Sequence, residues 1–239
     1  MEIKKNLQDI MNKEAGRNIA FRGFFDNNPV VDFDVIENSA IFWGNSDHLW
    51  AHLVAESPEE LYKLLKSYHR KTPYYYSVED WMIPIILKFG EAEWIMPTNR
   101  YILNADTPLP GPAQETEGID ISQSEYLYIN SDYQKYISIE YIRDRLQKDV
   151  SAGVQKMGQL AAWGLTHDDG AIGFLHVLEY YRKQGLGETV LLSLIQQKRR
   201  KNMPVFCNIV PENKVSVNLV TKTGFRFDRS VTWLKINIK

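Results

Sequence analysis

The sequence has a single cysteine, Cys207, so it cannot form an internal disulfide and offers no cysteine cluster for zinc. It has no excess of positive charge either, because 30 acidic residues outweigh 28 lysines and arginines and leave a formal net charge of −2. We therefore expect neither a nucleic acid nor a membrane as its main partner. No apolar run approaches the roughly 18 residues of a membrane-spanning helix, and residues 1–9 lack the apolar segment of a signal peptide. These absences predict a cytoplasmic protein without a bound metal.

The composition is that of a globular protein, with 44% hydrophobic, 12% aromatic and 24% charged residues among 239. A chain of this length buries about 70–75% of its extended surface, enough for one or two domains. Residues 105–118 include three prolines and a glycine within five positions, 108–112, which neither a helix nor a central strand accommodates. We expect this segment to link an N-terminal domain, 1–104, to a C-terminal domain, 119–239. The alternative is a long surface loop within one domain.

The first segment predicts a mixture of helices and strands. Ser57 is placed to cap a helix, and Ser77 is placed to open a second helix that Pro84 would kink. Strands are expected at 41–43, 50–55 and 94–103. This half has no glycine-rich loop and no cluster of catalytic residue types. Core packing explains its tryptophans, Trp43, Trp50 and Trp81, better than a ligand pocket does.

The second segment predicts a more regular alternation of strands and helices. We expect strands at 125–129, 152–156, 159–166, 171–178 and 205–210, one or two more within 225–238, and helices at 138–149, 185–201 and 212–223. Asp169 and Gly170 between two apolar runs indicate a hairpin. The basic residues 198–201 suit the negative pole of a helix dipole and indicate a solvated helix end rather than a nucleic-acid patch. The expected fold class is α+β, with a mixed sheet flanked by helices in the C-terminal half and a smaller α+β domain before it.

One stretch carries chemistry: residues 182–187, Arg-Lys-Gln-Gly-Leu-Gly, between an apolar strand and an amphipathic helix. Gly185 and Gly187 let the backbone approach a ligand closely, and the first N–H groups of a helix form an anion site. Arg182 and Lys183 add positive charge beside that site. A pyrophosphate docked on the first helical turn fits these features. The alternative is a tight strand-to-helix turn in which the glycines serve packing.

The strand order, this loop and the run LVTKTGF at 219–225 resemble the GNAT superfamily of acyl-CoA-dependent N-acyltransferases. Within it, residues 163–170 and 178–182 are most similar to the glycine N-acyltransferase-like branch. The resemblance covers about residues 120–236 and implies a mixed sheet whose fourth and fifth strands splay apart to admit the pantetheine arm of acyl-CoA. The first segment resembles the N-terminal half of that branch in position and in α+β character, which suggests a degenerate acyltransferase-like domain.

The resemblance also implies a binding site. The loop would hold the pyrophosphate of acetyl-CoA or another acyl-CoA, the preceding strand would pair with pantetheine, and one of its N–H groups would polarise the thioester carbonyl. The residues implied are Leu175, His176, Val177, Arg182, Lys183, Gln184, Gly185, Leu186, Gly187, Asn213 and Ser216. From the residues alone, Asn213 serves equally well as a helix cap and Ser216 as a solvent-facing residue.

Two side chains that many members of the superfamily use are missing. The position of the general base is Ala171 here, and its neighbour on the same face of the strand is Gly173. The position of the tyrosine that protonates the leaving thiolate is Val220. None of these residues can move a proton, so catalysis would need other groups or would rest on positioning and polarisation.

Several residues are candidates for the missing proton transfers. His176 has an ordinary pKa of about 6.5 and lies beside the expected thioester, but strand alternation places it on the opposite face unless a bulge intervenes. Asp169 is equally typical of a hairpin turn, Glu179 of a solvent-facing strand end, and Tyr181 of a packed ring. Cys207 has no base near it in the sequence. The base stays unassigned, with His176 as the candidate catalytic residue.

The leading hypothesis is an N-acyltransferase, in particular an acetyltransferase, that moves an acyl group to a primary amine of a small molecule, peptide or protein in a ternary complex. A second is a CoA-binding module with little catalysis, motivated by Ala171 and Val220. A third is transfer from an aminoacyl-tRNA, against which the net charge of −2 argues. The acceptor, the acyl length, the role of residues 1–104 and the oligomeric state, a homodimer included, are left open.

Overall fold

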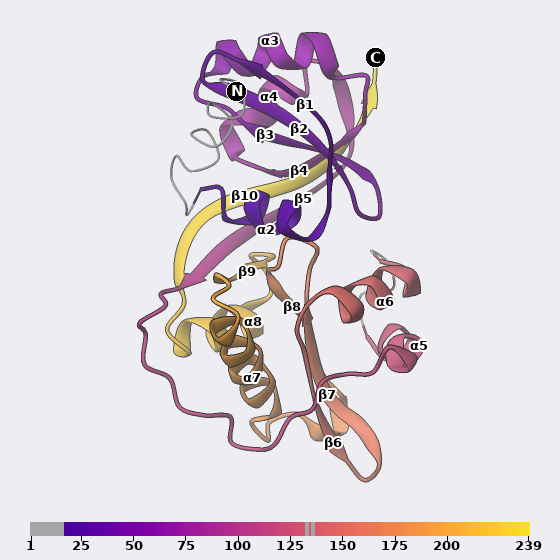
Figure 1. The fold of residues 1–239 in the computed structure, drawn as a ribbon, viewed down its shortest axis with the longest axis vertical. Coiled ribbons are helices and arrows are strands. Elements are labelled where there is room, and N and C mark those ends of the chain that lie inside the picture. Colours follow the sequence, from indigo (N-terminus) through magenta and orange to yellow (C-terminus); the bar gives the residue numbers. More distant parts are fainter. Residues whose placement is uncertain (1–16, 132–133, 135–136) are drawn as a thin grey trace. The chain divides into compact units, whose positions relative to one another are not determined.

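The computed structural model describes residues 17–131, 134 and 137–239, and no helix in this part of the chain is long and apolar enough to cross a membrane. The described residues form two compact units (Figure 1). Unit 1 comprises residues up to 100, 209–212 and 228–239, and unit 2 comprises 101–208 and 213–227. Neither unit is one continuous stretch of chain.

Unit 1 contains an antiparallel meander of strands followed by a helix and a further strand. Its elements are α2 (Ile19–Asn27), β1 (Val30–Ile36), β2 (Ser39–Asn45), β3 (Leu49–Val54), α3 (Pro58–Tyr68), β4 (Tyr74–Val78), the 3-10 helix η1 (Asp80–Met82), α4 (Ile83–Ile86) and β5 (Gly90–Leu103). Strands β3 and β4 run parallel and pair directly, with Trp50 opposite Tyr74 and His52 opposite Tyr76.

The helix starts expected in unit 1 have different outcomes. Ser57 caps α3 as predicted, because its hydroxyl accepts a hydrogen bond from the Glu60 N–H at 3.2 Å. The helix expected from Ser77 is wrong: Ser77 has a left-handed φ of 51°, and its hydroxyl accepts from Arg100 instead of capping a turn. Only η1 and the short α4 follow, and Pro84 takes the second position of α4, where its missing N–H costs no helical hydrogen bond.

The strands expected at 41–43, 50–55 and 94–103 are confirmed as β2, β3 and β5, whereas α2, β1 and β4 were not predicted. Trp43 and Trp50 are buried and Trp81 packs against the same core as Trp43, as expected.

Unit 2 contains the second meander, with helices before and after it. Its elements are η2 (Ile121–Gln123), α5 (Ser124–Ile129), α6 (Ile139–Lys148), β6 (Ser151–Lys156), β7 (Gln159–Thr166), β8 (Ile172–Val177), η3 (Glu179–Tyr181), α7 (Leu186–Arg200), β9 (Val205–Ile209), α8 (Lys214–Lys222) and the start of β10 (Arg226–Ile238).

Most of the expected elements of unit 2 are confirmed, but the strand expected at 125–129 is wrong, because these residues form α5. Their short run of apolar and aromatic residues suits a strand, yet the buried residues are Ser124 and Leu127, three apart, which is a helical spacing. The basic helix end at 198–201 is also only partly solvated. Lys198 is fully buried and its ammonium donates to the Gly170 carbonyl at 2.5 Å.

Both faces of the sheet β6–β7–β8 are covered. Trp163 of β7 points to one face, where it packs with Leu127 of α5 and Ile142 of α6. Gly164 points to the other face, where a Cβ would lie only 3.0 Å from Val190 of α7. Glycine at this position therefore allows α7 to pack closely on the sheet.

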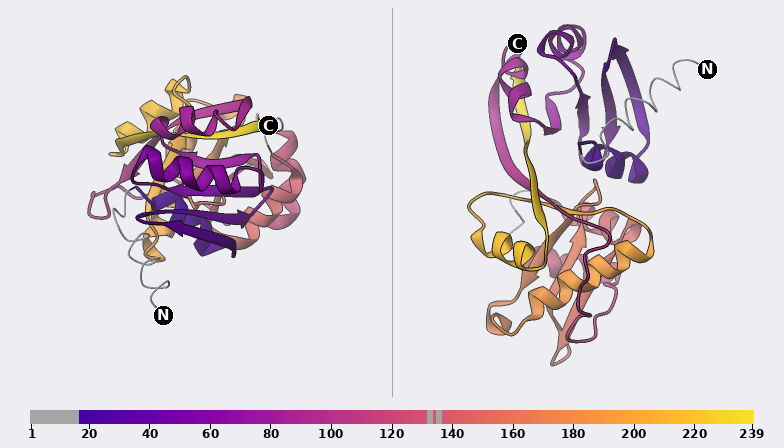
Figure 2. Two further views of the ribbon diagram at one scale, coloured as in Figure 1. Left: turned by 90° about the horizontal axis from the view of Figure 1, so that it is seen from above. Right: turned by 90° about the vertical axis from the view of Figure 1, so that its left-hand side faces the viewer.

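The two units repeat one succession of elements. The series β1–β2–β3, α3, β4 corresponds in order to β6–β7–β8, α7, β9, and each series leads to a long strand, β5 or β10. These long strands lie side by side (Figure 2) and are exchanged, since β10 neighbours β4 whereas β5 neighbours β9. The exchange explains why 228–239 belongs to unit 1 and the end of β5 to unit 2. The division therefore differs from the expected domains 1–104 and 119–239.

Residues 105–118 form no helix and no extended strand, but they are held by unit 2. The Thr116 hydroxyl lies 2.6 Å from that of Ser193, and Glu117 forms an isolated β-bridge with Gly153. These contacts attach the segment to unit 2.

Candidate functional site

The loop of residues 182–187 contains two left-handed residues before α7 begins. Lys183 has a φ of 62°, and Gly185, the N-cap of α7, has a φ of 76°. Glycine adopts this conformation without steric cost, and the space around its Cβ position is open to 4 Å. Gly187 has an ordinary φ, and a Cβ there would be 3.6 Å from Val177. The backbone thus requires glycine at 185, whereas glycine at 187 keeps the approach to the helix end clear.

The N-terminus of α7 has features of an anion site. Gly185 has no side chain to cap the helix, and the first helical hydrogen bond runs from the Thr189 N–H to the Gly185 carbonyl at 3.0 Å. The N–H groups of residues 186–188 therefore have no partner within the helix. Residues 182–184, two of them cationic, are exposed beside it. The helix dipole and these charges favour an anion here.

A bulge in β8 brings His176 to the face of Gly173. Trp163 of β7 lies opposite His176 and Leu165 opposite Gly173, so β8 has one residue more than β7 between these pairs. Phe174, within the bulge, has a φ of 49°. The His176 ring stacks on Trp163, with 4.7 Å between centroids. The bulge named as the exception to strand alternation is therefore present, and it places His176 on the same face as Gly173.

Strand β8 has one backbone edge that no strand of the described chain occupies. It is the last strand of the sheet β6–β7–β8, whereas β9, which follows α7, is the last strand of the seven-stranded sheet (Figure 1). Residues 176 and 177 therefore pair with β7 on one side only, and Leu175 lies in the bulge. The Val177 carbonyl also accepts from the Arg182 side chain at 3.1 Å. The corresponding strands of unit 1, β3 and β4, pair directly. The separation of fourth and fifth strands that the resemblance implies is thus found in unit 2.

Helix α8 begins at the next candidate residues. The Asn213 side chain caps it, accepting from the Ser216 N–H at 3.1 Å, so the helix-cap role of Asn213 is confirmed. Ser216 is half-buried rather than fully in solvent. The contact of these two residues with a CoA arm stays a prediction. Val220 of the same helix is buried.

The hydrogen bonds and the exposure of the other candidates for proton transfer explain them as structural or surface residues. Asp169 is buried and holds the hairpin turn by accepting from the Ala171 N–H at 2.8 Å. Tyr181 is buried and its hydroxyl accepts from a glutamine of β7 at 3.3 Å, and Glu179 is exposed. Burial raises the pKa of the Cys207 thiol, which keeps it protonated and unreactive. Across the described ranges, no group of three or more His, Cys, Asp or Glu residues is placed to hold a metal ion.

Sequence reasoning missed His167, which follows β7 at the hairpin. Its Nε2 lies 2.2 Å from the position that a Cβ on Gly173 would take, so the imidazole fills the space that the glycine leaves over β8. The backbone N–H of His167 donates to the Ala171 carbonyl at 2.8 Å, and the Arg145 side chain donates to the backbone carbonyl of His167 at 3.3 Å. The available signal was Gly173 itself, since glycine inside a strand often marks a close approach.

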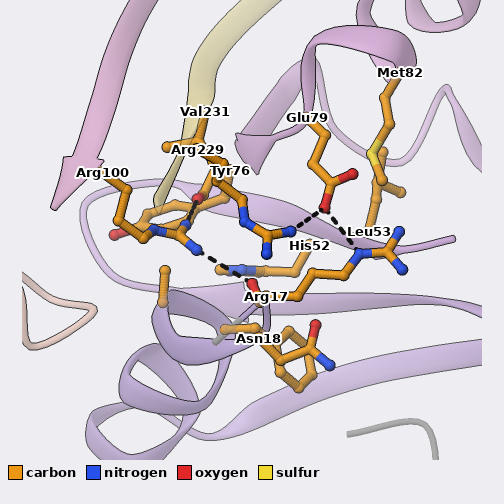
Figure 3. Close-up of a pocket in the computed structure, with 13 residues that line it drawn as sticks. Arg17, Asn18, His52, Leu53, Tyr76, Glu79, Met82, Arg100, Arg229 and Val231 are labelled. Carbon is orange, nitrogen blue, oxygen red and sulfur yellow. Dashed lines mark hydrogen bonds and ion pairs between the residues drawn. The ribbon is translucent and has the colours of Figure 1, made fainter. Parts of the chain in front are cut away.

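Unit 1 has a small cavity of about 30 Å³ among charged side chains (Figure 3). Arg17 and Arg229 donate to the Glu79 carboxylate at 2.8 and 3.1 Å, and Arg100 donates to the Arg17 carbonyl at 3.2 Å. These cations are therefore satisfied by the protein. His52 also lines the cavity, and its buried Nε2 has no hydrogen-bond partner among the described residues. The volume suits a water molecule and is too small for an acyl chain or an amine substrate.

The antiparallel meander β6–β7–β8, the glycine loop before α7 and the separate strand β9 define a GNAT-type α+β fold, in which a mixed sheet is flanked by helices. The family model described as FR47-like protein matches residues 151–234, from β6 into β10. No curated protein sequence is a significant match to the chain.

Solved structures share this fold. A Drosophila protein is similar with a TM-score of 0.74 and 16% identity, over 84% of this chain and 74% of that one. A GCN5-related N-acetyltransferase-like protein from Streptococcus suis is similar with a TM-score of 0.59 and 15% identity, over 98% of this chain and 99% of that one. A tandem GNAT protein from the clavulanic acid biosynthesis pathway is similar with a TM-score of 0.54 and 14% identity, over 92% and 87%. At these identities the likeness establishes the GNAT fold.

Proposed function

We propose that the protein is an acyl-CoA-dependent N-acyltransferase, in particular an acetyltransferase, acting on a primary amine of a small molecule, peptide or protein. The observation that carries the proposal is the position of the 182–187 loop, where Gly185 starts α7 beside the unpaired edge of β8. The FR47-like match and the GNAT neighbours support it. The finer assignment to the glycine N-acyltransferase-like branch rests on residues 163–170 and 178–182.

The proposed site binds acyl-CoA mainly through backbone. The N–H groups of residues 186–188 would hold the pyrophosphate, and the exposed Arg182 and Lys183 would attract it. The unpaired edge of residues 175–177 would pair with the pantetheine amides as a neighbouring strand does. Such a site leaves the acyl group against β8.

The reaction is a direct transfer. The lone pair of the acceptor nitrogen attacks the thioester carbonyl carbon, the C–N bond forms, the C–S bond breaks, and CoA leaves as the thiolate. A backbone N–H on the unpaired edge of residues 175–177 would donate to the carbonyl oxygen as it gains negative charge. Holding both reactants in one complex supplies much of the remaining rate enhancement.

Unit 1 repeats the order of elements but lacks these features in its described residues. Its β3–α3 connection carries no glycine, and the Ser57 hydroxyl already accepts from the first turn of α3. Glu59 and Glu60 place negative charge there, which repels a phosphate. We therefore propose one acyl-CoA site per chain.

The proposal is tested by titrating acetyl-CoA calorimetrically into Gly185→Val and a matched control, Gly158→Val. Gly158 lies in the β6–β7 turn with a φ of 78° and open space around its Cβ position, so both variants carry the same backbone strain. We expect a stoichiometry of one in the parent and control, and at least a tenfold weaker affinity in Gly185→Val. Equal affinities in the two folded variants would contradict the cofactor site.

A second candidate function is a CoA-binding module with little catalysis, favoured by the buried, non-titrating Ala171 and Val220. Release of the CoA thiol from acetyl-CoA in the presence of a panel of primary amines distinguishes the two. Binding of acetyl-CoA without amine-dependent thiol release would favour the module. Binding of aminoacyl-tRNA would instead favour the third hypothesis.

A further inference from the structure

We propose that His167 is the general base of this acyl transfer, supplied to β8 from the end of β7. The inference rests on the proposed function, because it assigns a role within the same site. Its basis is the pair formed by His167 and Gly173, in which the Nε2 atom lies 2.2 Å from the Cβ position of residue 173. Only a residue without a side chain at 173 leaves room for this ring.

The imidazole lies on the relevant part of β8. Gly173 is opposite Leu165, and His167 follows Leu165 by two residues, so all three share one face of the β7–β8 pair. Gly173 precedes by two residues the segment 175–177, whose unpaired edge is the proposed place of the thioester. As a whole residue, His167 is half-buried at the hairpin end of this face.

The surroundings keep the imidazole neutral. Burial, together with the positive charge of Arg145, lowers the pKa of His167 to about 4. Titratable groups of the packed elements include Tyr141 and Asp144 of α6, Asp168 and Asp169 of the hairpin, and His176 of β8. The Tyr141 hydroxyl bonds to Asp168, and Asp144 pairs with Arg145. At neutral pH one ring nitrogen is therefore unprotonated and can accept a proton, and the lowered pKa makes this ring a weaker base than an ordinary histidine.

The proton balance of the step is simple. As the acceptor nitrogen bonds to the carbonyl carbon it becomes positively charged, and the His167 ring takes one of its protons. The C–S electron pair leaves with the CoA sulfur, and the ring returns its proton to solvent or to the thiolate. Each group involved comes from the chain, acyl-CoA or the amine.

His176 is the competing base on the same face. Its ring stacks on Trp163 at an interplanar angle of 27°, beyond the bulge from Gly173. The His167 ring also packs on a ring, that of Phe174 at 4.4 Å between centroids, so ring packing alone does not separate the two histidines. What distinguishes His167 is that its ring occupies the space over β8 that Gly173 leaves.

The test compares full-length parent, His167→Gln, His167→Ala and the control His69→Gln. The Nδ1 atom of His69 lies 2.8 Å from the Leu65 carbonyl. His69 belongs to unit 1, whereas the proposed site is built from residues of unit 2. Thiol release from acetyl-CoA is measured with the most active amine of the panel, and the acetyl-CoA Kd is measured by calorimetry. Imidazole is then added to His167→Ala, whose empty space beside Gly173 can admit it.

We expect both His167 variants to lose about 10²–10⁴-fold in kcat, the range of a general base, with the Kd unchanged within twofold. Added imidazole should restore part of the turnover of His167→Ala alone, and His69→Gln should stay within threefold of the parent.

A folded His167→Gln with turnover within threefold of the parent overturns the assignment, as does a loss that imidazole does not rescue. If His167→Ala does not fold, the assignment is decided by His167→Gln, whose kcat is compared with that of the parent at an unchanged acetyl-CoA Kd. If the parent does not bind acetyl-CoA, the proposed function itself is overturned. If the parent binds acetyl-CoA and the His167 variants stay active, only the assignment of the base is overturned.

Discussion

The Nε2 atom of His167 lies 2.2 Å from the point at which any residue other than glycine would carry its Cβ at position 173. Side chains do not approach each other this closely, so the two residues are matched across the β7–β8 hairpin. A strand that lacks a titratable side chain of its own at 171 and 173 thereby has an imidazole over it.

The first prediction concerns this pair. Gly173→Ala should displace the His167 ring, because the methyl group would take its place. The ring is the far end of a side chain, so we expect the fold to survive with a loss of about 1–3 kcal/mol, typical of overpacking. Urea unfolding measures it, with Gly118→Ala as control because no atom lies within 4 Å of that Cβ position. Equal stability and equal turnover of the two variants would show that the ring moves without consequence.

The second prediction concerns the exchanged strands. A fragment of residues 119–239 loses β5, the neighbour of both β9 and β10, and it also loses β4, the other neighbour of β10. We expect this fragment to lack a cooperative thermal transition and to aggregate through its uncovered strand edges. Co-expression with residues 1–118 should restore a folded complex, measured by circular dichroism and light scattering. A fragment that unfolds cooperatively as a monomer would contradict the exchange.

The third prediction concerns His52, which is buried between the rings of Phe24 and Tyr76. Burial lowers the pKa of His52 to about 3, so below pH 6.5 the unfolded chain binds a proton that the folded chain does not. Stability therefore falls as pH falls from 6.5 towards 3, and the loss at pH 5 is about 2 kcal/mol.

His52→Phe should remove this pH-dependent loss of stability and keep the ring packing, since the cavity beside Nε2 gives room for the larger ring. The free energy of unfolding in urea, compared at pH 7.5 and pH 5, should then fall about 2 kcal/mol less in the variant than in the parent. Parallel losses would show that the proton binds His52 in the folded protein.

Local patterns predicted much of unit 2. Ser138 caps α6 by accepting from the Tyr141 N–H, and Asp169 with Gly170 forms the hairpin turn, because these contacts lie within a few residues. The loop 182–187 was likewise predicted, since Gly185 and the start of α7 are fixed by neighbouring backbone. The prediction for 125–129 failed because an apolar run of only five residues suits either a strand or a helix.

The sequence by itself therefore determined the glycine-containing loop before α7, the meander and the absence of titratable side chains at 171 and 220, which are properties of single residues and near neighbours. Tertiary structure alone decided the bulge at Phe174, the exchange of β5 and β10, and the place of His167 over Gly173. Each of these depends on which strands pair and in what register. Pairing is set by packing between residues far apart in the chain, and no local pattern contains it.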